Sequence, residues 1–332
     1  MTTSMTTMFR LLLCSPIARP FFSTPLSLCF SRLKTNLHCK CAEMGAGSVN
    51  SEYFRPANFR LCNVSGFMTE LLEIEAPSPT MHILFIPGYP GVITFYKDFL
   101  ESLYERLDGK ASITAIGHIC HSSKDWEHGR LFSLDDQINH KVAHSIGSHI
   151  SMEIFKRVSD KIIYFIGLYP FLALNTKSSK QTTIRKLAES PILCSFVSSI
   201  VALLGLVPSL SRFIVKKTLG NSWSDAAIDA ACSHLVKYHT MRNVLFMAMT
   251  EFQKFSQAPD WDFLREKSGQ IAFLFGIDDH WGPLSLFEEI SKQAPAVALS
   301  IEKEGHDHAY CCTEAGSTWV AQHVAGLIKK HL

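Results

Sequence analysis

Ser145 has the sequence surroundings of a catalytic nucleophile. It lies in the run Ala143-His144-Ser145-Ile146-Gly147, directly ahead of a pattern typical of a helix. A serine on a tight strand-to-helix turn needs small residues two positions before and after it, because the backbones approach closely there. Ala143 and Gly147 meet that requirement. A serine alone is not nucleophilic at neutral pH, so the chain must also supply a histidine base and a carboxylate that orients it.

A carboxylate and a histidine follow in the chain order that this chemistry has in α/β proteins. Asp278 and Asp279 come directly after one strand-like run, and His306 and His308 come after the next. Side chains just past the carboxyl ends of parallel strands meet at one edge of a sheet. We therefore predict an acyl-transfer triad of serine, aspartate and histidine, in which either member of each pair remains open.

An early loop can supply the backbone donors that acyl transfer also requires. The apolar run 82–86 ends in Pro87-Gly88-Tyr89-Pro90-Gly91, whose glycines allow close backbone approach. We predict that the N–H groups of Tyr89 and Ile146 bind the oxyanion of the tetrahedral intermediate. This chemistry needs no cofactor and no metal, and none is predicted.

Six histidines lie between His118 and His149 and raise the question of a metal site. Only His118 and His121 are closely spaced, and the nearby carboxylates follow no metal-ligand pattern. We interpret these histidines as solvated or core residues.

Apolar runs alternate with helix-length patterns along most of the chain, which predicts an α/β fold. We expect a mostly parallel sheet with helices on both faces. The expected strands are 59–64, 68–74, 82–86, 113–116, 161–166, 270–275 and 297–301, and the clearest helices are 96–107 and 317–330.

The pattern changes to helices alone between Pro170 and Pro259. We therefore divide the chain into the first part of the core (54–170), a helical cap (171–262) and the second part of the core (263–332). Within the cap, residues 191–207 contain no charge over 17 residues, whereas a spanning helix needs roughly twenty. This stretch predicts a buried cap helix or an interfacial lipid contact, and a true span is the weakest of the three interpretations.

The net charge of +2 is unevenly distributed. Residues 1–41 carry five basic residues and no acidic one, so the remainder has 27 basic against 30 acidic residues. That balance is not typical of a nucleic-acid-binding protein. Residues 1–45 have the composition of a chloroplast or mitochondrial targeting segment, with an unfolded leader as the alternative. Ten scattered cysteines indicate reduced thiols in a protein that is not secreted.

Several of these motifs together resemble the lipid droplet-associated hydrolase family. The resemblance runs from about Phe59 to the C-terminus, although Tyr89 stands where the family often has a polar residue. It is carried by Phe85-Ile86-Pro87-Gly88-Tyr89-Pro90-Gly91 with Phe95-Tyr96, the turn His144-Ser145-Ile146-Gly147-Ser148, Leu168-Tyr169-Pro170, Asp279-His280-Trp281 and His308-Ala309-Tyr310.

The resemblance implies an α/β-hydrolase fold with a cap and a serine esterase or lipase that acts on neutral lipid esters. It implies attachment to lipid droplets or the endoplasmic reticulum, for which residues 191–207 are the candidate surface. By motif it assigns Ser145 as nucleophile, Asp279 as acid and His308 as base, with Asp278 and His306 as alternatives. Neither the acyl and alcohol parts of the ester nor the oligomeric state follows from it.

The segment before Ser145 departs from the family pattern. A strand that feeds such a turn is buried on both faces and therefore apolar, but residues 135–144 contain three charged residues and only three apolar ones. The family has a helix and a strand there, which would occupy roughly twenty residues. We predict that this chain lacks such a segment after Lys141 or Val142. The chain would then be a poorly folded or inactive esterase, or a catalytically impaired protein of the lipid droplet or membrane surface.

Overall fold

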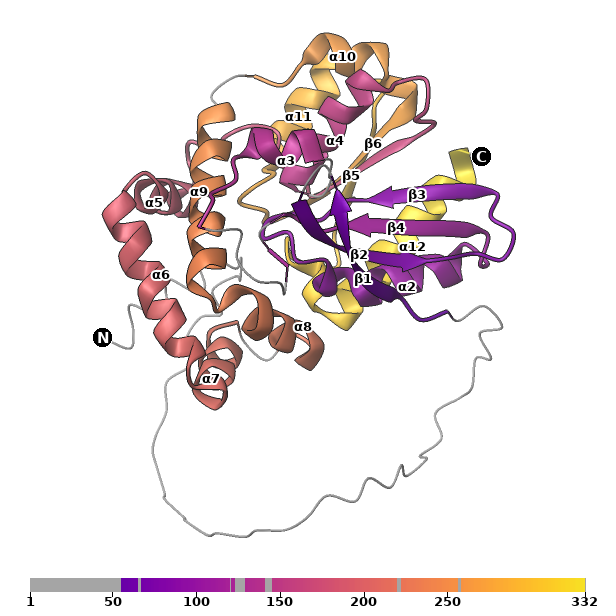
Figure 1. The fold of residues 1–332 in the computed structure, drawn as a ribbon. Helices are drawn as coiled ribbons and strands as arrows, with labels where there is room; N and C mark the ends of the chain where they lie inside the picture. Colours follow the sequence, from indigo (N-terminus) through magenta and orange to yellow (C-terminus); the bar gives the residue numbers. More distant parts are fainter. Residues whose placement is uncertain are drawn as a thin grey trace, which may run out of the picture.

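A computed structural model describes residues 55–331, except for 65–66, 120, 123–128, 141–144, 220–221 and 256–257. The predicted leader, the turn after the first strand and Ala143 lie outside the described residues. The described chain forms two groups of strands with flanking helices and a separate group of helices (Figure 1).

The strands form two sheets that are not hydrogen-bonded to each other. The first sheet has the order β1-β2-β4-β3, with β1 and β2 antiparallel, β2 and β4 antiparallel, and β3 and β4 parallel. The second has the order β5-β6-β7 and is entirely parallel. The strands are β1 (Asn58–Val64), β2 (Phe67–Ile74), β3 (Met81–Phe85), β4 (Ala111–Ile116), β5 (Phe165–Leu168), β6 (Ile271–Gly276) and β7 (Ala298–Glu302).

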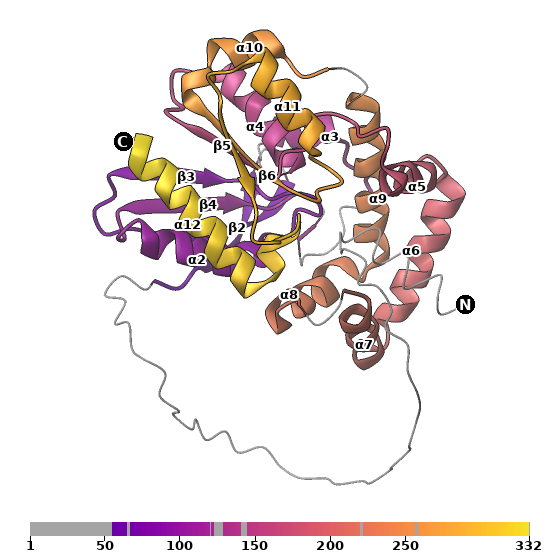
Figure 2. The same ribbon diagram turned by 180° about the vertical axis from the view of Figure 1, so that it is seen from behind.

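Helices cover both faces of these sheets, so the predicted α/β class is confirmed. Because side chains alternate along a strand, Phe273 and Phe275 of β6 face an apolar cluster with α4, α10 and α11, while Leu274 joins the cluster that contains α2 and α12. Figure 2 shows α12 crossing the back of the molecule. These helices are α2 (Lys97–Arg106), α4 (Ile146–Arg157), α10 (Trp261–Glu266), α11 (Leu284–Gln293) and α12 (Glu314–His331).

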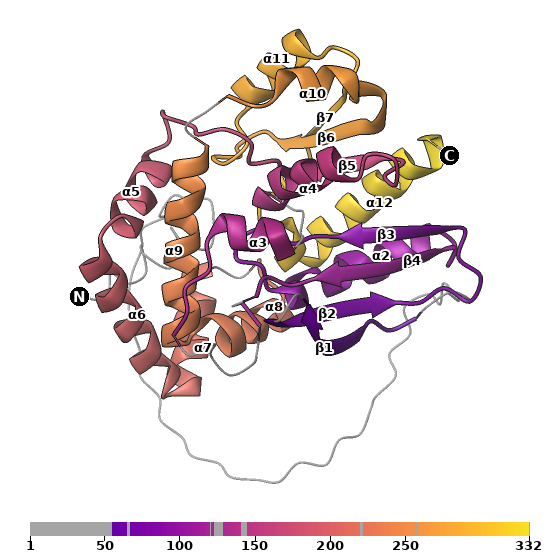
Figure 3. The ribbon, with the colours of Figure 1, turned by 45° about the horizontal axis from the view of Figure 1, so that its top comes forward.

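Five further helices, called the cap below, follow β5 and precede α10. They are α5 (Ser179–Ala188), α6 (Pro191–Gly205), α7 (Pro208–Leu219), α8 (Asp225–Ala230) and α9 (Tyr238–Lys254), with a π-helical turn, η2 (Ala231–Leu235), after α8. Ser178, Ser190 and Ser224 begin α5, α6 and α8 by accepting a hydrogen bond from a backbone N–H in the first turn. In Figures 1 and 3, α9 stands between the core and the pair α5 and α6.

The sheet is interrupted where the sequence predicts a missing strand. Figure 3 shows the strands in the order β7, β6, β5, β3, β4, β2 and β1, and no hydrogen-bond pairing joins β5 to β3. Between β4 and α4, the described residues form one short helix, α3 (Leu134–His140), and no strand. One parallel strand between β3 and β5 would make the sheet continuous.

Helix α4 and a cluster of tyrosines hold the two sheets together across this break. At the start of α4, a Cβ built on Gly147 would lie 2.9 Å from the carbonyl oxygen of Pro87, just after β3. The ring of Tyr310, which follows β7, lies 5.3 Å from that of Tyr169 and 6.5 Å from that of Tyr96. Tyr96 closes the short helix η1 (Ile93–Tyr96) behind β3, so the aromatic cluster joins both sheets.

The strand predicted over 161–166 is wrong in its first part, since β5 begins at Phe165. The carbonyl groups of Ile162 and Ile163 accept hydrogen bonds from the side chain of Gln270 instead of from a neighbouring strand. The side chain of Ile163 is exposed. An apolar run therefore resembled a buried strand although its first half lies outside the sheet. The other six predicted strands agree with the structure to within two residues.

We predict that backbone amides of β3 and β5 that face the break exchange with solvent about tenfold faster than those of β6, because β6 is paired on both sides. Hydrogen exchange resolved to single amides measures this. Inserting a helix and a strand of about twenty residues in total before the Ser145 turn should slow exchange in β3 and β5 only. Equal exchange in all three strands before insertion would contradict the divided sheet.

Candidate active site

The turn that carries Ser145 has a strained backbone. Ser145 precedes α4 with φ of 55° and ψ of −107°, a region that residues with a side chain rarely adopt. Its carbonyl accepts hydrogen bonds from the N–H groups of Ser148 (3.0 Å) and Phe171 (3.1 Å). Phe171 follows β5, so the turn is fixed by the second sheet even though the described residues include no strand that feeds it.

Close packing explains the glycine two residues after Ser145. A Cβ on Gly147 would lie 2.9 Å from the carbonyl oxygen of Pro87 and 3.1 Å from that of Ile86. Backbone atoms cannot move aside as the end of a side chain can. Gly147 therefore lets the first turn of α4 rest directly on the end of β3 and on the loop that follows it.

Three side chains from distant parts of the chain meet at this turn. The Nε2 atom of His308 lies 2.8 Å from the Oγ atom of Ser145, and its Nδ1 atom lies 2.9 Å from Oδ2 of Asp279. The other carboxylate oxygen of Asp279 accepts a hydrogen bond of 2.8 Å from the N–H of Trp281. The arrangement is that of a serine, histidine and carboxylate relay.

The two residues that the sequence left as alternatives lie elsewhere. Asp278 is exposed. The carbonyl group of His306 accepts a hydrogen bond from the hydroxyl of Tyr169, and its ring lies 6.0 Å from that of Trp319. Of each pair, His308 is therefore the histidine in contact with Ser145, and Asp279 is the carboxylate in contact with His308.

The loop predicted to hold the oxyanion donors is fixed by two side chains. The hydroxyl of Tyr96 accepts a hydrogen bond of 2.9 Å from the N–H of Gly88, and Nδ1 of His121 accepts one of 2.9 Å from the N–H of Gly91. These bonds lie on either side of Tyr89, whose hydroxyl donates to the carbonyl group of Val244 in α9.

The second predicted donor is the N–H of Ile146, the first residue of α4. An N–H in the first turn has no carbonyl within its own helix to bind. Because Gly147 rests on Pro87, this end of α4 and the loop that contains Tyr89 border the same space beside Ser145.

Sequence reasoning missed the roles of Tyr96 and His121. In the sequence, Tyr96 belongs to a motif that gives it no role, and the pattern around His121 indicates only a solvated or core histidine. His121 is indeed buried, but its hydrogen bond to Gly91 gives it a part in shaping the site. The proximity of His118 and His121 to the early loop depends on the pairing of β3 with β4, which a sequence pattern does not specify.

An apolar wall surrounds the triad on the cap side. The ring of Phe171 lies 4.7 Å from that of Phe255 and 5.2 Å from that of Trp281. Trp281 in turn lies 6.3 Å from the ring of His308 and 6.5 Å from that of Phe252. Both Phe252 and Phe255 belong to the α9 end of the cap. The wall would exclude water and favour an apolar group beside Ser145.

The fold and this arrangement define the class of protein. Solved structures that share the fold include a haloalkane dehalogenase from Agrobacterium tumefaciens (TM-score 0.61, 12% identity, covering 85% of this chain and 100% of that one). An esterase from Thermogutta terrifontis is also similar (TM-score 0.55, 12% identity, 83% and 99% covered). The chain thus has the α/β-hydrolase fold that the resemblance implied.

Sequence similarity identifies the family within that class. The family model described as lipid-droplet associated hydrolase matches residues 79–143 and 142–311. The lipid droplet-associated hydrolase of Dictyostelium discoideum is 24% identical over 273 residues, covering 73% of this chain and 86% of that protein. The protein of the same name from Gallus gallus is 25% identical over 275 residues, covering 70% and 80%. The chain belongs to the lipid droplet-associated hydrolase family and is a hydrolase.

The family match is divided at the same place as the sheet. Its two parts meet at residues 142–143, directly ahead of the Ser145 turn and within the segment where the sequence predicts a missing helix and strand. Two independent observations, the divided match and the break between β3 and β5, therefore agree on one position.

We predict that acid destabilises this protein through His121 and His149. Burial lowers the pKa of His121 to about 3, with a smaller contribution from His234, and burial lowers that of His149 to about 4. In the unfolded chain both titrate near 6.5. The unfolded state therefore binds more protons below pH 6.5, and stability falls as the pH decreases from 6.5 toward these values.

The free energy of unfolding should fall by up to about 1.4 kcal/mol for each histidine when the pH is lowered by one unit. Denaturant unfolding between pH 5 and 7 measures it. His121→Gln should reduce this pH dependence of the free energy of unfolding by the contribution of one histidine. His82→Gln, at an exposed position, should leave it unchanged. An unchanged pH dependence in His121→Gln would contradict this account of the buried ring.

Proposed function

We propose that the protein is a serine esterase that hydrolyses carboxylic esters of neutral lipids. The observation that carries this proposal is the continuous set of contacts from Ser145 through His308 to Asp279. Membership of the lipid droplet-associated hydrolase family supports a lipid as the substrate.

The proposed reaction is acyl transfer in two steps. His308 takes the proton of Ser145 as the serine oxygen attacks the ester carbonyl, while Asp279 holds the imidazole and stabilises its charged form. The N–H groups of Tyr89 and Ile146 bind the oxyanion. The alcohol then leaves with a proton from His308, and water attacks the acyl-enzyme with His308 again as base. No step requires a group from outside the protein except the ester and water.

An exposed apolar face of the cap supports attachment to a lipid surface. One side of α6 is buried against the cap, and the other carries exposed apolar side chains that continue onto α7. We call this set the outer apolar face: Ile192, Leu193, Phe196, Leu203, Leu206, Val207, Leu210 and Phe213. Side chains such as Ile192 (81% exposed) and Leu206 (76% exposed) are far more exposed than large apolar residues usually are.

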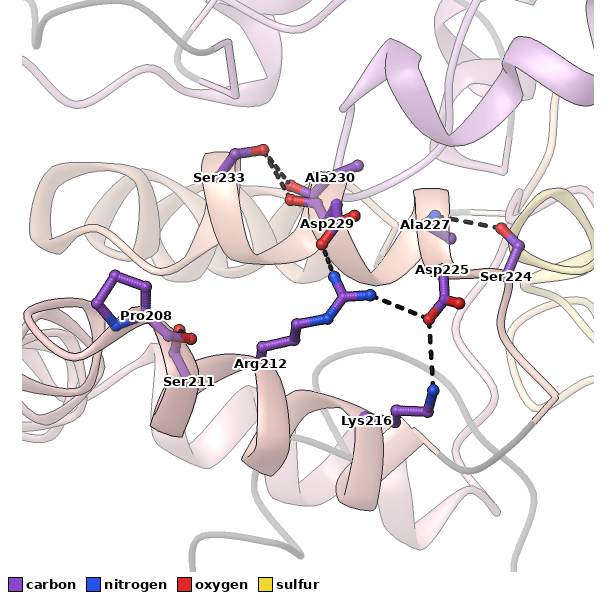
Figure 4. A network of polar contacts seen from close by, with 10 residues as sticks. All are labelled: Pro208, Ser211, Arg212, Lys216, Ser224, Asp225, Ala227, Asp229, Ala230 and Ser233. Carbon is purple, nitrogen blue, oxygen red and sulfur yellow. Dashed lines mark hydrogen bonds and ion pairs between the residues drawn. The ribbon is translucent and has the colours of Figure 1, made fainter. Parts of the chain in front are cut away.

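Ion pairs fix the rotation of α7 so that its apolar side chains face outward. Arg212 of α7 pairs with Asp225 (3.0 Å) and Asp229 of α8, and Lys216 pairs with Asp225 (3.3 Å), as Figure 4 shows. Phe213 lies on the side of α7 away from the buried face, with the Lys217 ammonium 6.0 Å from its ring centre. A basic residue beside an exposed aromatic one is typical of helices that lie in a membrane interface.

The length of these helices bears on how the chain would meet lipid. Within the described residues, no single helix has the length and apolar composition to cross a membrane, and one pair, α5 with α6, meets these two criteria only when taken together, although it bends by 95°. An interfacial contact through the outer apolar face is therefore the form of attachment we propose, at the lipid droplets that give the relatives their name. Localisation to the endoplasmic reticulum, chloroplast or mitochondrion remains a prediction from the resemblance and from residues 1–45.

A second function is favoured by the break in the sheet. Because the described residues include no strand that supports the Ser145 turn, a protein that binds the lipid surface through its cap and turns over esters slowly or not at all is the alternative. Labelling of folded protein by a fluorophosphonate separates the two cases, since it requires an activated serine.

We predict that Ser145→Ala abolishes ester hydrolysis and that Asp279→Asn lowers kcat by about 10⁴-fold, because the imidazole would lose its orienting carboxylate. Hydrolysis of short and long acyl esters measures both. Asp278→Asn and His306→Gln, at neighbouring positions outside the contact, serve as matched controls and should retain most activity. Loss of activity in the controls with retention in Asp279→Asn would contradict the assignment.

We also predict that replacing Ile192, Phe196 and Leu203 together with serine weakens binding to lipid by at least about tenfold, because three large side chains would no longer leave water. Flotation with triacylglycerol emulsions coated with phosphatidylcholine measures the bound fraction. The control is a variant in which Phe59 and Leu61, two exposed apolar residues of β1, are both replaced with serine. Equal binding by the natural chain, the cap variant and the β1 variant would show that the outer apolar face is not the attachment surface.

A further inference from the structure

Glu251 is a buried residue of α9 whose carboxyl group has one oxygen without a hydrogen-bond partner in the described part of the chain. Its side chain lies in α9 and the residue is 4% exposed. Oε1 has no hydrogen-bond partner among the described residues. Burial raises the pKa of Glu251 well above its usual value, which favours the neutral form of the carboxyl group. Such an unpaired polar group destabilises the fold and calls for an explanation.

Helix periodicity directs Glu251 toward the active site. Residues four apart share one face of a helix, so Glu251 lies between Met247 and Phe255. Both belong to the apolar cluster that contains Ile146 beside the nucleophile. Of the residues on this face, Val244, Met247, Ala248, Glu251 and Phe255, Glu251 alone is polar.

Two contacts anchor this face of α9 on either side of Glu251. Seven residues before it, the carbonyl group of Val244 accepts a hydrogen bond from Tyr89 in the early loop. Four residues after it, Phe255 packs at 4.7 Å on Phe171, whose N–H binds the carbonyl group of Ser145. Along α9, Glu251 thus lies between the contact with the early loop and the contact with the residue that holds the Ser145 turn.

We propose that Glu251 is a binding residue for a hydroxyl group of the lipid ester, so that the substrates are hydroxyl-bearing esters such as partial glycerides. This inference rests on the proposed esterase function. A neutral carboxyl group donates one hydrogen bond and accepts another. A hydroxyl group can accept the hydrogen bond that the carboxyl group donates and can donate one to the carboxyl group in return. An ester carbonyl or an ether oxygen can only accept. In an otherwise apolar wall, a ligand without a hydroxyl leaves the acceptor of Glu251 unpaired, which disfavours its binding.

A pair of ligands that differ only in whether their two hydroxyl groups are free or methylated tests the proposal. A 1-O-alkylglycerol and its dimethyl ether have the same chain and cannot be hydrolysed. Each competes with a fluorophosphonate for Ser145 in the full-length chain, and the concentration that halves the labelling rate gives its apparent Kd. We expect the alkylglycerol to protect about fivefold to tenfold better than its dimethyl ether, the effect of one neutral hydrogen bond.

Variants assign that preference to the carboxyl group. In Glu251→Met, the ratio of the apparent Kd values of the two ligands should fall to near one. Glu251→Gln keeps a donor and an acceptor, so most of the preference for the alkylglycerol should remain. Gln253→Met, on the exposed side of α9, controls for a change in the helix. A ratio that is the same in Glu251→Met and in the natural chain overturns the inference while the esterase function stands. Absence of labelling in folded protein overturns the esterase function and this inference with it.

Discussion

The relative position of two sheets that share no hydrogen bonds determines whether this protein can work. The early loop, which we propose supplies a backbone donor, follows β3 of the first sheet, whereas Asp279 and His308 follow β6 and β7 of the second. A serine triad tolerates errors of only about an ångström before catalysis suffers. Here that precision depends on side-chain packing, since the described residues contribute no strand between β3 and β5.

Two groups of contacts meet this requirement in different ways. The first turn of α4 rests on the end of β3 through Gly147 and is tied to the second sheet through Phe171. Tyr96 and Tyr169 contribute both through the packing of their rings and through hydrogen bonds of their hydroxyl groups. Their rings pack across the break, while the hydroxyl of Tyr96 binds the early loop after β3 and that of Tyr169 binds the loop that contains His308. Close packing of buried aromatic rings is well suited to fixing distances, but it does not replace the hydrogen bonds that a central strand would add.

The fold class, six of the seven strands and the proximity of Ser145, Asp279 and His308 could be predicted from the sequence, because each depends on a local pattern or on chain order. Ser145, for example, has small neighbours and a following helix, and Asp279 and His308 come directly after apolar runs. Features that depend on tertiary contact were not accessible. Nothing adjacent to Glu251 in the chain distinguishes it from a solvated helix residue, and Ile163 belongs to an apolar run but lies outside the sheet. The prediction of a missing strand depended on two things: the residues before Ser145 are too polar to be buried on both faces, and the family that the sequence resembles has a helix and a strand there.

The most direct test of this account is a crystal structure of the chain after reaction with a fluorophosphonate, which leaves a stable tetrahedral group on an activated serine. We expect phosphorus bonded to Oγ of Ser145, with one phosphoryl oxygen about 3 Å from the N–H groups of Tyr89 and Ile146. That result would show that loops from both sheets meet at one point despite the break. A phosphoryl oxygen directed away from both amides, or a reagent bound to a residue other than Ser145, would contradict the account.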